Sequence, residues 1–273
     1  MQEIIASRRN ENVKFASYIS KSSSFRKKEG LCFLEGARLC ADAALSGNKI
    51  RTLFFTPKAG SKYESYISRI KDSADKIYSI DSHIADYLAD TKNSQGIFCI
   101  CEIPKAENTL AGHVPGGNYL ALENIQNPDN LGAALRTAEA FGISGVVFGG
   151  NCCDAYSPKS LRAGMGAVFR LPVYIEKDMA AAVRQLNVLG FETYAAVPDR
   201  TALPVTEADF GKPSVMVVGN EGNGLTEATV RECGKCVTIP MPGRAESLNA
   251  SAAAAILMWE MMRHKAAGGD PHG

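Results

Sequence analysis

The chain has 273 residues, of which 45% are hydrophobic and 22% are charged, a composition typical of a soluble globular protein with one large or two smaller domains. It has no apolar run of roughly 18 residues and no basic-then-apolar N-terminus, which argues against a membrane span or secretion signal and predicts a cytoplasmic protein. The net charge of +1 is unevenly divided, because residues 1–51 carry ten basic and five acidic side chains (+5), while the rest carries 20 basic and 24 acidic ones (−4).

Helical and strand-like patterns alternate through the first hundred residues, which indicates a small α/β domain over residues 1–103. Asn10–Ser20 has apolar residues at helical spacing, whereas Lys21–Glu29 is polar, basic and serine-rich and predicts a loop. The helices expected after it are Ala37–Ser46, Tyr63–Ser73 and Ser82–Ala89, and the strands are Leu31–Leu34, Ile50–Phe55, Lys76–Ile80 and Gly96–Glu102.

Residues 104–117 are rich in proline and glycine and predict a linker. The alternation then resumes and indicates a second α/β domain over residues 118–273. Its expected strands are Asn118–Glu123, Gly145–Phe148, Phe191–Val197, Val215–Val218 and Cys236–Ile239, with Val168–Tyr174 as a further extended piece. Its expected helices are Leu131–Phe141, Ser160–Gly164, Met179–Leu189, a short one after residue 224 and a long apolar one from about Asn249.

Eight cysteines are too few for a disulfide scaffold in a chain of this length. The only Cys-x-x-Cys pair, Cys233 and Cys236, would need two further ligands to bind zinc, and the four histidines show no ligand spacing. We therefore expect reduced structural thiols and no metal. The basic excess at the N-terminal end suggests a nucleic-acid contact, although a solvated charged face explains such an excess about as often.

Three polar loops follow buried strands of the second domain, which is where ligands bind in open α/β sheets. The first, 124–130, leads into a helix that carries Arg136. The second, 219–224, is a glycine-rich turn that matches neither a dinucleotide signature nor a phosphate loop, and its glycines let a ligand approach the backbone closely. The third, 240–249, enters a helix made of small residues. A capped helix with a solvated arginine, an ordinary turn and a packed core helix are the alternative interpretations.

Taken together, the three loops resemble the three sequence motifs of the SpoU (TrmH) family of RNA ribose 2′-O-methyltransferases. The matching residues are Asn127-Pro128-x-Asn130-x-Gly132-Ala133-x-x-Arg136-Thr137-Ala138, then Gly219-x-Glu221-Gly222-x-Gly224, then Ile239-Pro240-Met241-x-Gly243 with Glu246-Ser247-Leu248-Asn249. The resemblance covers about residues 118–265. It implies a mostly parallel α/β sheet with helices on both faces and a trefoil knot at its carboxyl end, S-adenosylmethionine as cofactor, RNA as substrate, and a homodimer.

The resemblance also implies roles for individual residues. Arg136 would stabilise the developing alkoxide or hold the adjacent phosphate, because an arginine stays protonated and is a poor literal base. Asn130 would orient the sugar or Arg136, and Glu221 would buttress the site or lie near the positive charge of the cofactor. Ser247 and Asn249 would complete the polar lining. The cofactor would be held by Gly219, Asn220, Gly222, Ile239, Met241, Ser247 and Leu248.

The first domain shows a looser resemblance, through Ser7, Asn10, Lys14, the basic run 26–28 and Phe33-Leu34-Glu35-Gly36, to the ribosomal-protein-like substrate-binding domain of many family members. The residues expected to contact RNA phosphates are Arg8, Arg9, Lys14, Arg26, Lys27 and Lys28. Ribosomal RNA is favoured because members with such a domain commonly act on it. Transfer RNA stays open as the substrate, and so does an RNA-binding protein that has lost catalysis.

Overall fold

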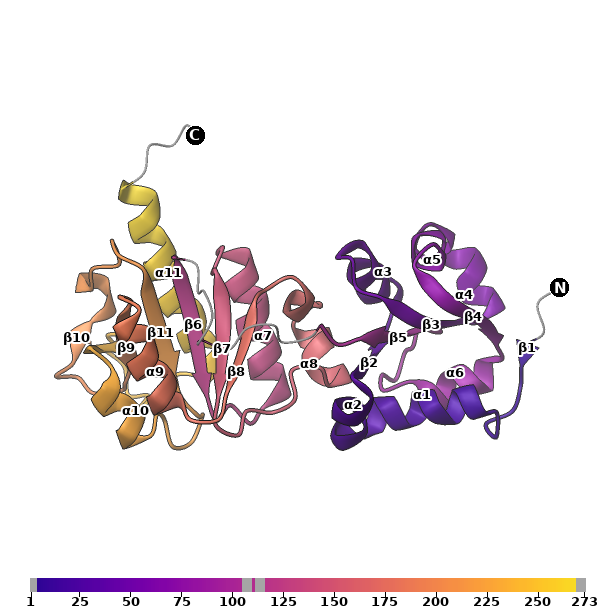
Figure 1. Cartoon of the computed structure of the whole chain (residues 1–273), viewed down its shortest axis with the longest axis horizontal. Helices are drawn as coiled ribbons and strands as arrows, with labels where there is room; N and C mark the ends of the chain where they lie inside the picture. Colours follow the sequence, from indigo (N-terminus) through magenta and orange to yellow (C-terminus); the bar gives the residue numbers. More distant parts are fainter. Residues whose placement is uncertain (1–3, 105–109, 111–115, 269–273) are drawn as a thin grey trace. The chain divides into compact units, whose positions relative to one another are not determined.

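The computed structural model describes residues 4–104, 110 and 116–268, and the chain divides into two compact units (Figure 1). Unit 1 consists of Met1–Lys105 and Asp154–Arg170, and unit 2 consists of Ala106–Cys153 and Leu171–Gly273. The segment 154–170 belongs to the second domain of the sequence analysis, and in the structure it packs within unit 1. Most of the predicted linker, 104–117, lies outside the described residues.

Unit 1 is built around a five-stranded mixed sheet in the order β1-β4-β3-β5-β2, in which β5 runs antiparallel to β2 and β3. Its strands are β1 (Ile4–Ile5), β2 (Leu31–Glu35), β3 (Ile50–Phe55), β4 (Ala74–Ile80) and β5 (Ile97–Glu102). Its helices are α1 (Glu11–Lys21), α2 (Ser23–Glu29), α3 (Ala37–Leu45), α4 (Pro57–Lys62), α5 (Glu64–Lys71), α6 (Ser82–Leu88) and α8 (Pro158–Ala163), followed by the 3₁₀ turn η1 (Ala167–Phe169).

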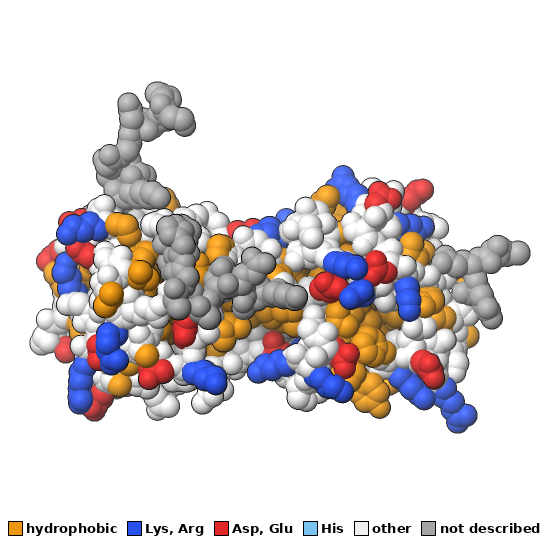
Figure 2. All heavy atoms as spheres, in the orientation of Figure 1, with side chains coloured by type: hydrophobic (Ala, Val, Ile, Leu, Met, Phe, Trp, Pro, Cys, Tyr) orange, Lys and Arg blue, Asp and Glu red, His pale blue; other side chains and the backbone are white. Residues whose placement is uncertain are grey.

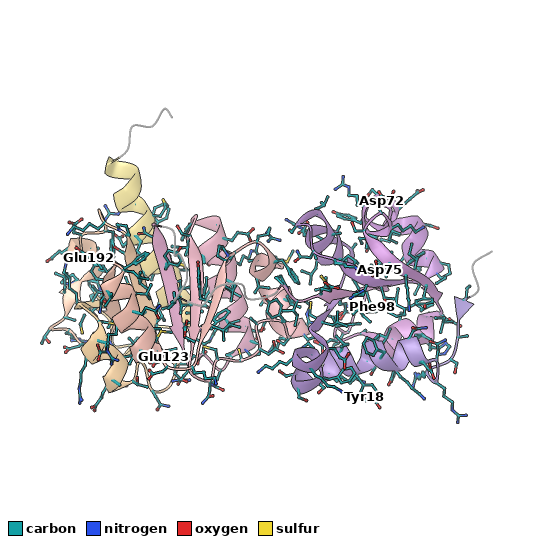
Figure 3. The ribbon with its side chains drawn as sticks, in the orientation of Figure 1. Tyr18, Asp72, Asp75, Phe98, Glu123 and Glu192 are labelled. Carbon is teal, nitrogen blue, oxygen red and sulfur yellow. The ribbon has the colours of Figure 1, made fainter. Side chains whose placement is uncertain are left out.

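The core of unit 1 forms where α1 and α6 cover one face of this sheet. Val13 on α1 and Ile84 on α6 are fully buried against Phe33 and Phe98, whose rings stack with centroids 5.6 Å apart. Phe98 is labelled in the interior of the unit in Figure 3. Removing a side chain of this size from water contributes about 1.5–3 kcal/mol to folding. The alternation of strands and helices predicted for this half is confirmed, and these elements enclose a hydrophobic core.

The stretch Lys21–Glu29 was predicted to be a loop, and this prediction is wrong. The Ser22 side chain accepts a hydrogen bond from the Phe25 amide and begins α2, and Gly30 ends it in the left-handed conformation (φ 65°). The Phe25 ring packs edge-on against Phe15 of α1 (5.6 Å between centroids). Tertiary contacts and two good caps thus override the polar composition.

Unit 2 contains a seven-stranded sheet, all of it parallel, in the order β10-β12-β9-β11-β6-β7-β8. The strands are β6 (Asn118–Glu123), β7 (Gly145–Gly149), β8 (Val173–Glu176), β9 (Glu192–Ala196), β10 (Leu203–Pro204), β11 (Ser214–Val218) and β12 (Lys235–Thr238). The helices are α7 (Pro128–Ala140), α9 (Met179–Val188), α10 (Glu227–Glu232) and α11 (Ala250–Gly268), with the 3₁₀ turn η2 (Val205–Glu207).

Helices cover both faces of this sheet, as predicted: α9 and α10 pack on one face, and α7 and α11 on the other (Figure 1). The buried runs of β6 and β11 are apolar on both faces, which is typical of a parallel sheet between two helical layers. Tyr119, Val183 and Val217 meet in the core on the α9 side. The α/β fold class is therefore confirmed, and the trefoil knot stays a prediction.

Two smaller differences concern segments with little periodic signal. Val168–Tyr174 was predicted to be extended, but it begins in η1 and only its end enters β8. The short β1, β10 and α4 were not predicted, because pieces of two to six residues carry too little pattern. Within the described residues, no helix combines the length and apolar character that crossing a membrane requires.

Candidate active site

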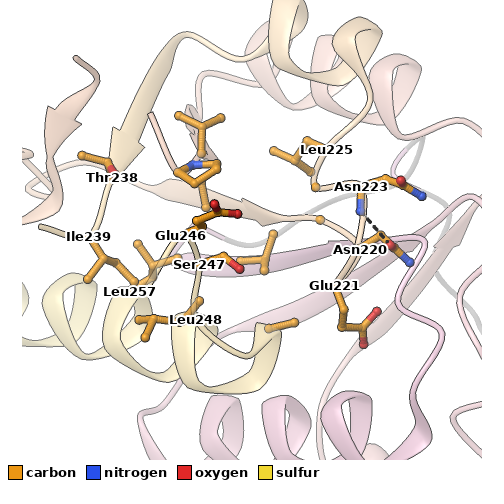
Figure 4. Close-up of a pocket in the computed structure, with 18 of the residues that line it drawn as sticks. Asn220, Glu221, Asn223, Leu225, Thr238, Ile239, Glu246, Ser247, Leu248 and Leu257 are labelled. Carbon is orange, nitrogen blue, oxygen red and sulfur yellow. Dashed lines mark hydrogen bonds between the residues drawn. The ribbon is translucent and has the colours of Figure 1, made fainter. Parts of the chain in front are cut away.

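The carboxyl ends of the parallel strands of unit 2 lie at one edge of the sheet, and the glycine-rich turn after β11 is the centre of that edge. Asn220 and Gly224 exchange backbone hydrogen bonds (3.0 and 2.9 Å), and Gly224 takes a positive φ of 67°. The Asn220 side chain accepts hydrogen bonds from the amides of Gly222 and Asn223 (2.8 and 3.1 Å; Figure 4). A Cβ on Gly219 would lie 2.2 Å from the Gly224 carbonyl carbon, so only glycine permits this closed turn.

The turn is also fastened to its neighbours. The Asn220 Nδ2 donates to the Asn124 carbonyl at 2.8 Å, which joins it to the loop after β6. Glu123, a buried carboxylate at the end of β6 (Figure 3), accepts hydrogen bonds from Thr226 and Thr229, which follow the turn. These contacts give the turn a fixed position before any ligand arrives. The sequence prediction did not include Glu123, although a carboxylate ending an apolar strand was a usable signal.

One residue from each predicted motif takes part in a single chain of hydrogen bonds. The Asn249 Nδ2 donates to Asn130 Oδ1, and Asn130 Nδ2 donates to Glu221 Oε1, each at 2.9 Å. Asn249 also caps α11, because its Oδ1 accepts from the Ser251 amide at 3.0 Å. Three loops that are far apart in the sequence are thus joined by side chains that sequence reasoning had assigned to one site.

The carboxylate of Glu221 is the only formal charge in this chain of hydrogen bonds. Burial raises the pKa of Glu221. Hydrogen bonds from Asn130 and from backbone amides, including that of Gln126, together lower it by more, so the pKa lies below the ordinary value. Glu221 is therefore ionised at neutral pH. It fixes the orientation of the Asn130 amide, whose Nδ2 must point to Glu221 and whose Oδ1 must then point to Asn249.

A cavity of about 420 Å³ opens beside this network at the carboxyl ends of β9, β11 and β12 (Figure 4). Its walls are largely apolar, with Leu225 and Leu257 on opposite sides in the view of Figure 4. Its volume is that of a site for a small organic ligand. All seven residues predicted to hold the cofactor line it: Gly219, Asn220, Gly222, Ile239, Met241, Ser247 and Leu248.

The cavity also includes residues that the sequence prediction missed. Ala196 ends β9, and Val197 and Pro198 follow it. Because β9 neighbours both β11 and β12, strand order brings these residues to the cavity although they belong to no motif. Glu246, which belongs to the third motif but was given no role, lines it too, and Glu221 lines it while its carboxylate accepts hydrogen bonds from Asn130 and the Gln126 amide. A ligand with positive charge suits such a lining.

Arg136 lies on α7, six residues beyond Asn130, and its side chain is exposed. Among the described residues no hydrogen bond or ion pair holds its guanidinium. It is therefore free to contact an anionic substrate, whereas Asn130 on the same helix is buried in the network. The structure brings Asn130, Glu221 and Asn249 into direct contact and leaves Arg136 and Ser247 outside their hydrogen bonds.

The basic residues predicted to bind RNA lie in unit 1, where Figure 2 shows lysines and arginines interspersed with acidic side chains. Arg8, Arg9, Lys14, Lys27 and Lys28 are exposed. Arg8 lies over the Tyr87 ring at 5.1 Å, and Lys21 lies over the same ring at 4.7 Å. Cations held this way on α1 and before it can meet phosphate while keeping their stems packed.

Arg26 corrects the prediction, because it is 4% exposed and fully engaged. Its Nε and Nη2 donate to Asp154 Oδ2 at 2.8 and 2.7 Å, and its Nη1 donates to the carbonyls of Ile19 and Ser20. Four of its five N–H donors are used inside the protein, and the side chain is buried, so it is not a surface cation available to RNA. Its charge instead anchors Asp154, the first residue of the segment 154–170 that packs in unit 1.

The Cys233–Cys236 pair lies away from this network. Burial raises the pKa of Cys233 to about 12, with the neighbouring Cys236 adding to the effect, so the thiol stays protonated at neutral pH. A protonated thiol is a poor nucleophile. Cys233 packs against the core of unit 2.

Comparison with known families gives two matches. Residues 117–259 match the model of the SpoU rRNA Methylase family, and residues 10–99 match the model of the MRM3-like substrate binding domain. The chain is 28% identical to the 23S rRNA (guanosine(2553)-2′-O)-methyltransferase RlmP of Bacillus subtilis, over 94% of this chain and 98% of that protein. It is 31% identical to the mouse protein rRNA methyltransferase 3, mitochondrial, over 90% of this chain and 70% of the relative.

Among solved structures, the AdoMet-bound rRNA methyltransferase of Sinorhizobium meliloti is similar over nearly its whole length. The TM-score is 0.85 at 28% sequence identity, and the alignment covers 96% of this chain and 98% of the other. The similarity therefore extends over both units rather than over unit 2 alone.

Proposed function

Because the chain belongs to the SpoU rRNA methylase family, we propose that it transfers a methyl group from S-adenosylmethionine to a ribose 2′-hydroxyl of RNA. The observation that carries the proposal is the chain of hydrogen bonds from Asn249 through Asn130 to Glu221, beside a cavity of cofactor size. It unites the three motifs in one place. An RNA-binding protein without catalysis would have no need to keep these side chains in register.

The cavity after β9, β11 and β12 suits this cofactor. Its apolar walls suit the adenine ring, and the carboxylates of Glu221 and Glu246 suit a cationic ligand. Gly219, Ile239 and Leu248 would meet the adenosyl part, with Asn220, Gly222, Met241 and Ser247 completing the lining. Bound S-adenosylmethionine would supply a methyl group activated by a positively charged sulfur.

Methyl transfer requires the ribose oxygen to be aligned with the methyl group and relieved of its proton. Arg136, exposed and unpaired among the described residues, would bind the adjacent phosphate or stabilise the charge that develops on the 2′-oxygen. Its guanidinium stays protonated, so it acts here as a cation and not as a base. Asn130 would orient the sugar, and Glu221 would hold Asn130 in the orientation that this requires.

Unit 1 would hold the rest of the substrate. Exposed Arg8, Arg9, Lys14, Lys27 and Lys28 would contact RNA phosphates, which makes the affinity fall as salt rises. Arg26 is not included, because it is buried and four of its five donors bond within the protein. The match of residues 10–99 to a substrate-binding domain supports this division of labour. Ribosomal RNA is the favoured substrate, since the relatives from Bacillus, Sinorhizobium and mouse are all named as rRNA methyltransferases.

A homodimer is the proposed assembly. Trp259 and Ile256 on α11 are 47% and 39% exposed, and the Trp259 ring packs against Phe141 at the end of α7, with centroids 5.7 Å apart. Large exposed apolar side chains grouped on one helix are typical of a subunit interface. Sedimentation of the wild type as a dimer and of Trp259→Glu as a monomer would support this surface. None of the eight cysteines, all of which lie in the described residues, forms a disulfide, which fits a cytoplasmic location.

The test is methyl transfer from labelled S-adenosylmethionine to unmodified total RNA, followed by nucleoside analysis. A labelled 2′-O-methylnucleoside in ribosomal RNA is the expected product, and the same product in transfer RNA would correct the substrate. Binding of the cofactor without transfer to free RNA would call for a partly assembled ribosomal particle as the substrate. Failure of both transfer and cofactor binding would overturn the enzymatic proposal.

A further inference from the structure

Unit 1 contains a cavity of about 480 Å³ that no part of the proposed mechanism uses. Three segments surround it: the end of β2 with the first turn of α3, the loop 91–95, and the end of α8. Arg162 and Met165, which line it, lie in the part of the sequence that matches the methylase model, although they pack in unit 1. The cavity is therefore complete only because segment 154–170 joins this unit.

Basic side chains outnumber acidic ones in the lining. Arg38, Lys92 and Arg162 face a single carboxylate, Glu35, whose oxygens are already occupied: they accept hydrogen bonds from the Asp90 amide (2.9 Å) and from Thr91 Oγ1 (2.5 Å). Glu35 thus holds the loop 91–95 in place. Arg38 and Arg162 also pair with Asp42 and Asp90 (3.6 and 2.6 Å), whereas Lys92 makes no ion pair with described residues. Lys92 is therefore the cation of the lining that is most available to an anionic ligand.

Arg162 has a hydrogen-bond donor to spare. Its Nη2 donates to Asp90 Oδ2 at 2.6 Å, whereas its Nη1 is buried and has no hydrogen-bond partner among the described residues. A buried donor without an acceptor costs about 1–3 kcal/mol, and such groups are rare in native structures. Because Nη1 is closed off from solvent here, an oxygen of a bound anion would satisfy it once the guanidinium turns toward the cavity.

The first turn of α3 adds further donors. No side chain caps this nine-residue helix, and its N-cap is Gly36. The Ala37 amide donates to Gln95 Oε1 at 2.7 Å, but the Arg38 and Leu39 amides precede the first intrahelical bond, from Cys40 to Gly36. Both residues line the cavity. Free amides at a helix N-terminus attract phosphate.

Apolar side chains complete the cavity, so it suits more than a bare anion. Leu39 and Met165 both line it. Met165 adopts φ +48°, a conformation that non-glycine residues rarely take, and Gly166 follows at φ +72°. Such backbone strain costs about 1–3 kcal/mol and is kept where a side chain needs a particular position. Here the turn puts a flexible thioether at the rim of a cationic pocket.

We propose that this cavity binds one unstacked nucleotide of the RNA substrate. Its phosphate would meet Arg162, Lys92 and the α3 amides, and its base would pack against Leu39 and Met165. RNA-binding proteins commonly read unpaired bases splayed out of the chain in this way. The inference rests on the proposed function, in that it takes RNA as the substrate, and it adds a site that selects RNA by an unpaired nucleotide away from the methylated one.

The experiment measures binding of a labelled, unmodified large-subunit ribosomal RNA transcript over a range of salt, without cofactor. Lys92→Gln, Arg162→Gln, their double variant and Met165→Ala are compared with Lys76→Gln, an exposed lysine of unit 1 outside the cavity. Lys92 is exposed and makes no ion pair with described residues, so its variant should fold; the melting temperature of Arg162→Gln shows whether removing the ion pair with Asp90 unfolds it.

Each charge variant should bind roughly three- to tenfold more weakly, with the slope of log affinity against log salt reduced by about 0.7. The fold-loss of RNA affinity in the double variant should be smaller than the product of the fold-losses of the two single variants, because both side chains would hold the same phosphate. Met165→Ala should weaken binding with the slope unchanged. Affinities and slopes equal to those of Lys76→Gln would overturn the proposal.

Two further outcomes separate this proposal from the methyltransferase one. If methyl transfer is absent but the variants weaken RNA binding as described, the nucleotide site stands and the proposed reaction falls. If transfer occurs and the variants bind RNA like the control, the cavity proposal alone falls. Binding of inorganic phosphate that depends on Arg162, with RNA affinity unchanged, would likewise overturn it in favour of a small-anion site.

Discussion

The two units use polar side chains in opposite ways. In unit 2, Asn130, Glu221 and Asn249 are hydrogen-bonded to one another at 2.9 Å, so each one fixes the next. In unit 1, Lys14 and Lys27 are exposed and make no ion pair with described residues. A network of this kind depends on every member, whereas dispersed charges contribute in small increments. Single substitutions should therefore have large effects in the first region and small, salt-dependent effects in the second.

Arg26 is the exception that tests this comparison most strongly, because it is a basic residue of unit 1 with a fully engaged side chain. Arg26→Met keeps the bulk of the side chain but leaves Asp154, whose side chain is 15% exposed, without its cation. Breaking a buried pair from one side costs about 3–5 kcal/mol. We expect a matching loss in the free energy of unfolding of unit 1, followed by chemical denaturation.

Lys27→Met is the matched control, since Lys27 is adjacent and exposed. Its unfolding free energy should stay within about 0.5 kcal/mol of the wild type. Equal midpoints for the two variants would show that Arg26 contributes no more than a surface charge. The anchoring role given to the Arg26–Asp154 pair would then be wrong.

Arg26 also shows where sequence reasoning reaches its limit. Arg26, Lys27 and Lys28 form one basic run, and nothing local distinguishes its first member from the others. The difference arises because α2 directs Arg26 toward the interior and Asp154 arrives there from a segment 128 residues away in the chain. A contact of this range is invisible to composition and periodicity, as was the inclusion of 154–170 in unit 1.

The second-largest effect should come from Arg136, the exposed cation of the first motif. Arg136→Ala should reduce methyl transfer by about 10²–10³-fold, the cost of removing one charge-stabilising donor from a transition state. Cofactor binding, measured by calorimetry, should be nearly unchanged, because Arg136 does not line the cavity. Arg200→Ala, an exposed arginine of unit 2 outside the motifs, should keep full activity. Retained activity in Arg136→Ala would reject its assignment.

A smaller effect, of about tenfold on transfer, is expected for Glu221→Gln, because glutamine can still accept a hydrogen bond from Asn130 but carries no charge.

The pKa of Glu221 is lowered in the folded protein, so its stabilising effect is complete above the ordinary pKa of 4.5 and is lost as the pH falls through the lowered value. The wild type should therefore lose activity and unit 2 stability below about pH 4.5.

The variant supplies the control for this pH dependence. Glu221→Gln cannot titrate at this position, so its stability should change less than that of the wild type as the pH falls below 4.5. Parallel thermal melts of the two proteins between neutral and acid pH make the measurement. Identical acid transitions would mean that another carboxylate controls the loss of stability at low pH, and that the charge of Glu221 does not contribute to it.

The catalytic edge was more predictable than the RNA-binding unit for a physical reason. Loops that follow parallel strands meet at one edge of the sheet, so motifs after β6, β11 and β12 converge once the fold class is known. The chain of hydrogen bonds through Asn130 is the consequence. Ala196–Pro198 were not predicted, because no local pattern indicates the strand order. It is this order that puts β9 between β11 and β12.

The smallest effect per residue should come from the exposed lysines of α2. Lys28 lies 3.8 Å from Glu29 with 77% of its side chain exposed, so this ion pair adds little stability and leaves the lysine available for phosphate. Lys27→Gln combined with Lys28→Gln should weaken RNA binding severalfold and lower the salt slope by about 0.7 for each phosphate that is no longer neutralised. The transfer rate at saturating RNA should not change. If the transfer rate fell as much as in Arg136→Ala, these lysines would take part in the reaction itself. The proposed difference between the aligned network of unit 2 and the RNA-binding charges of unit 1 would then be wrong.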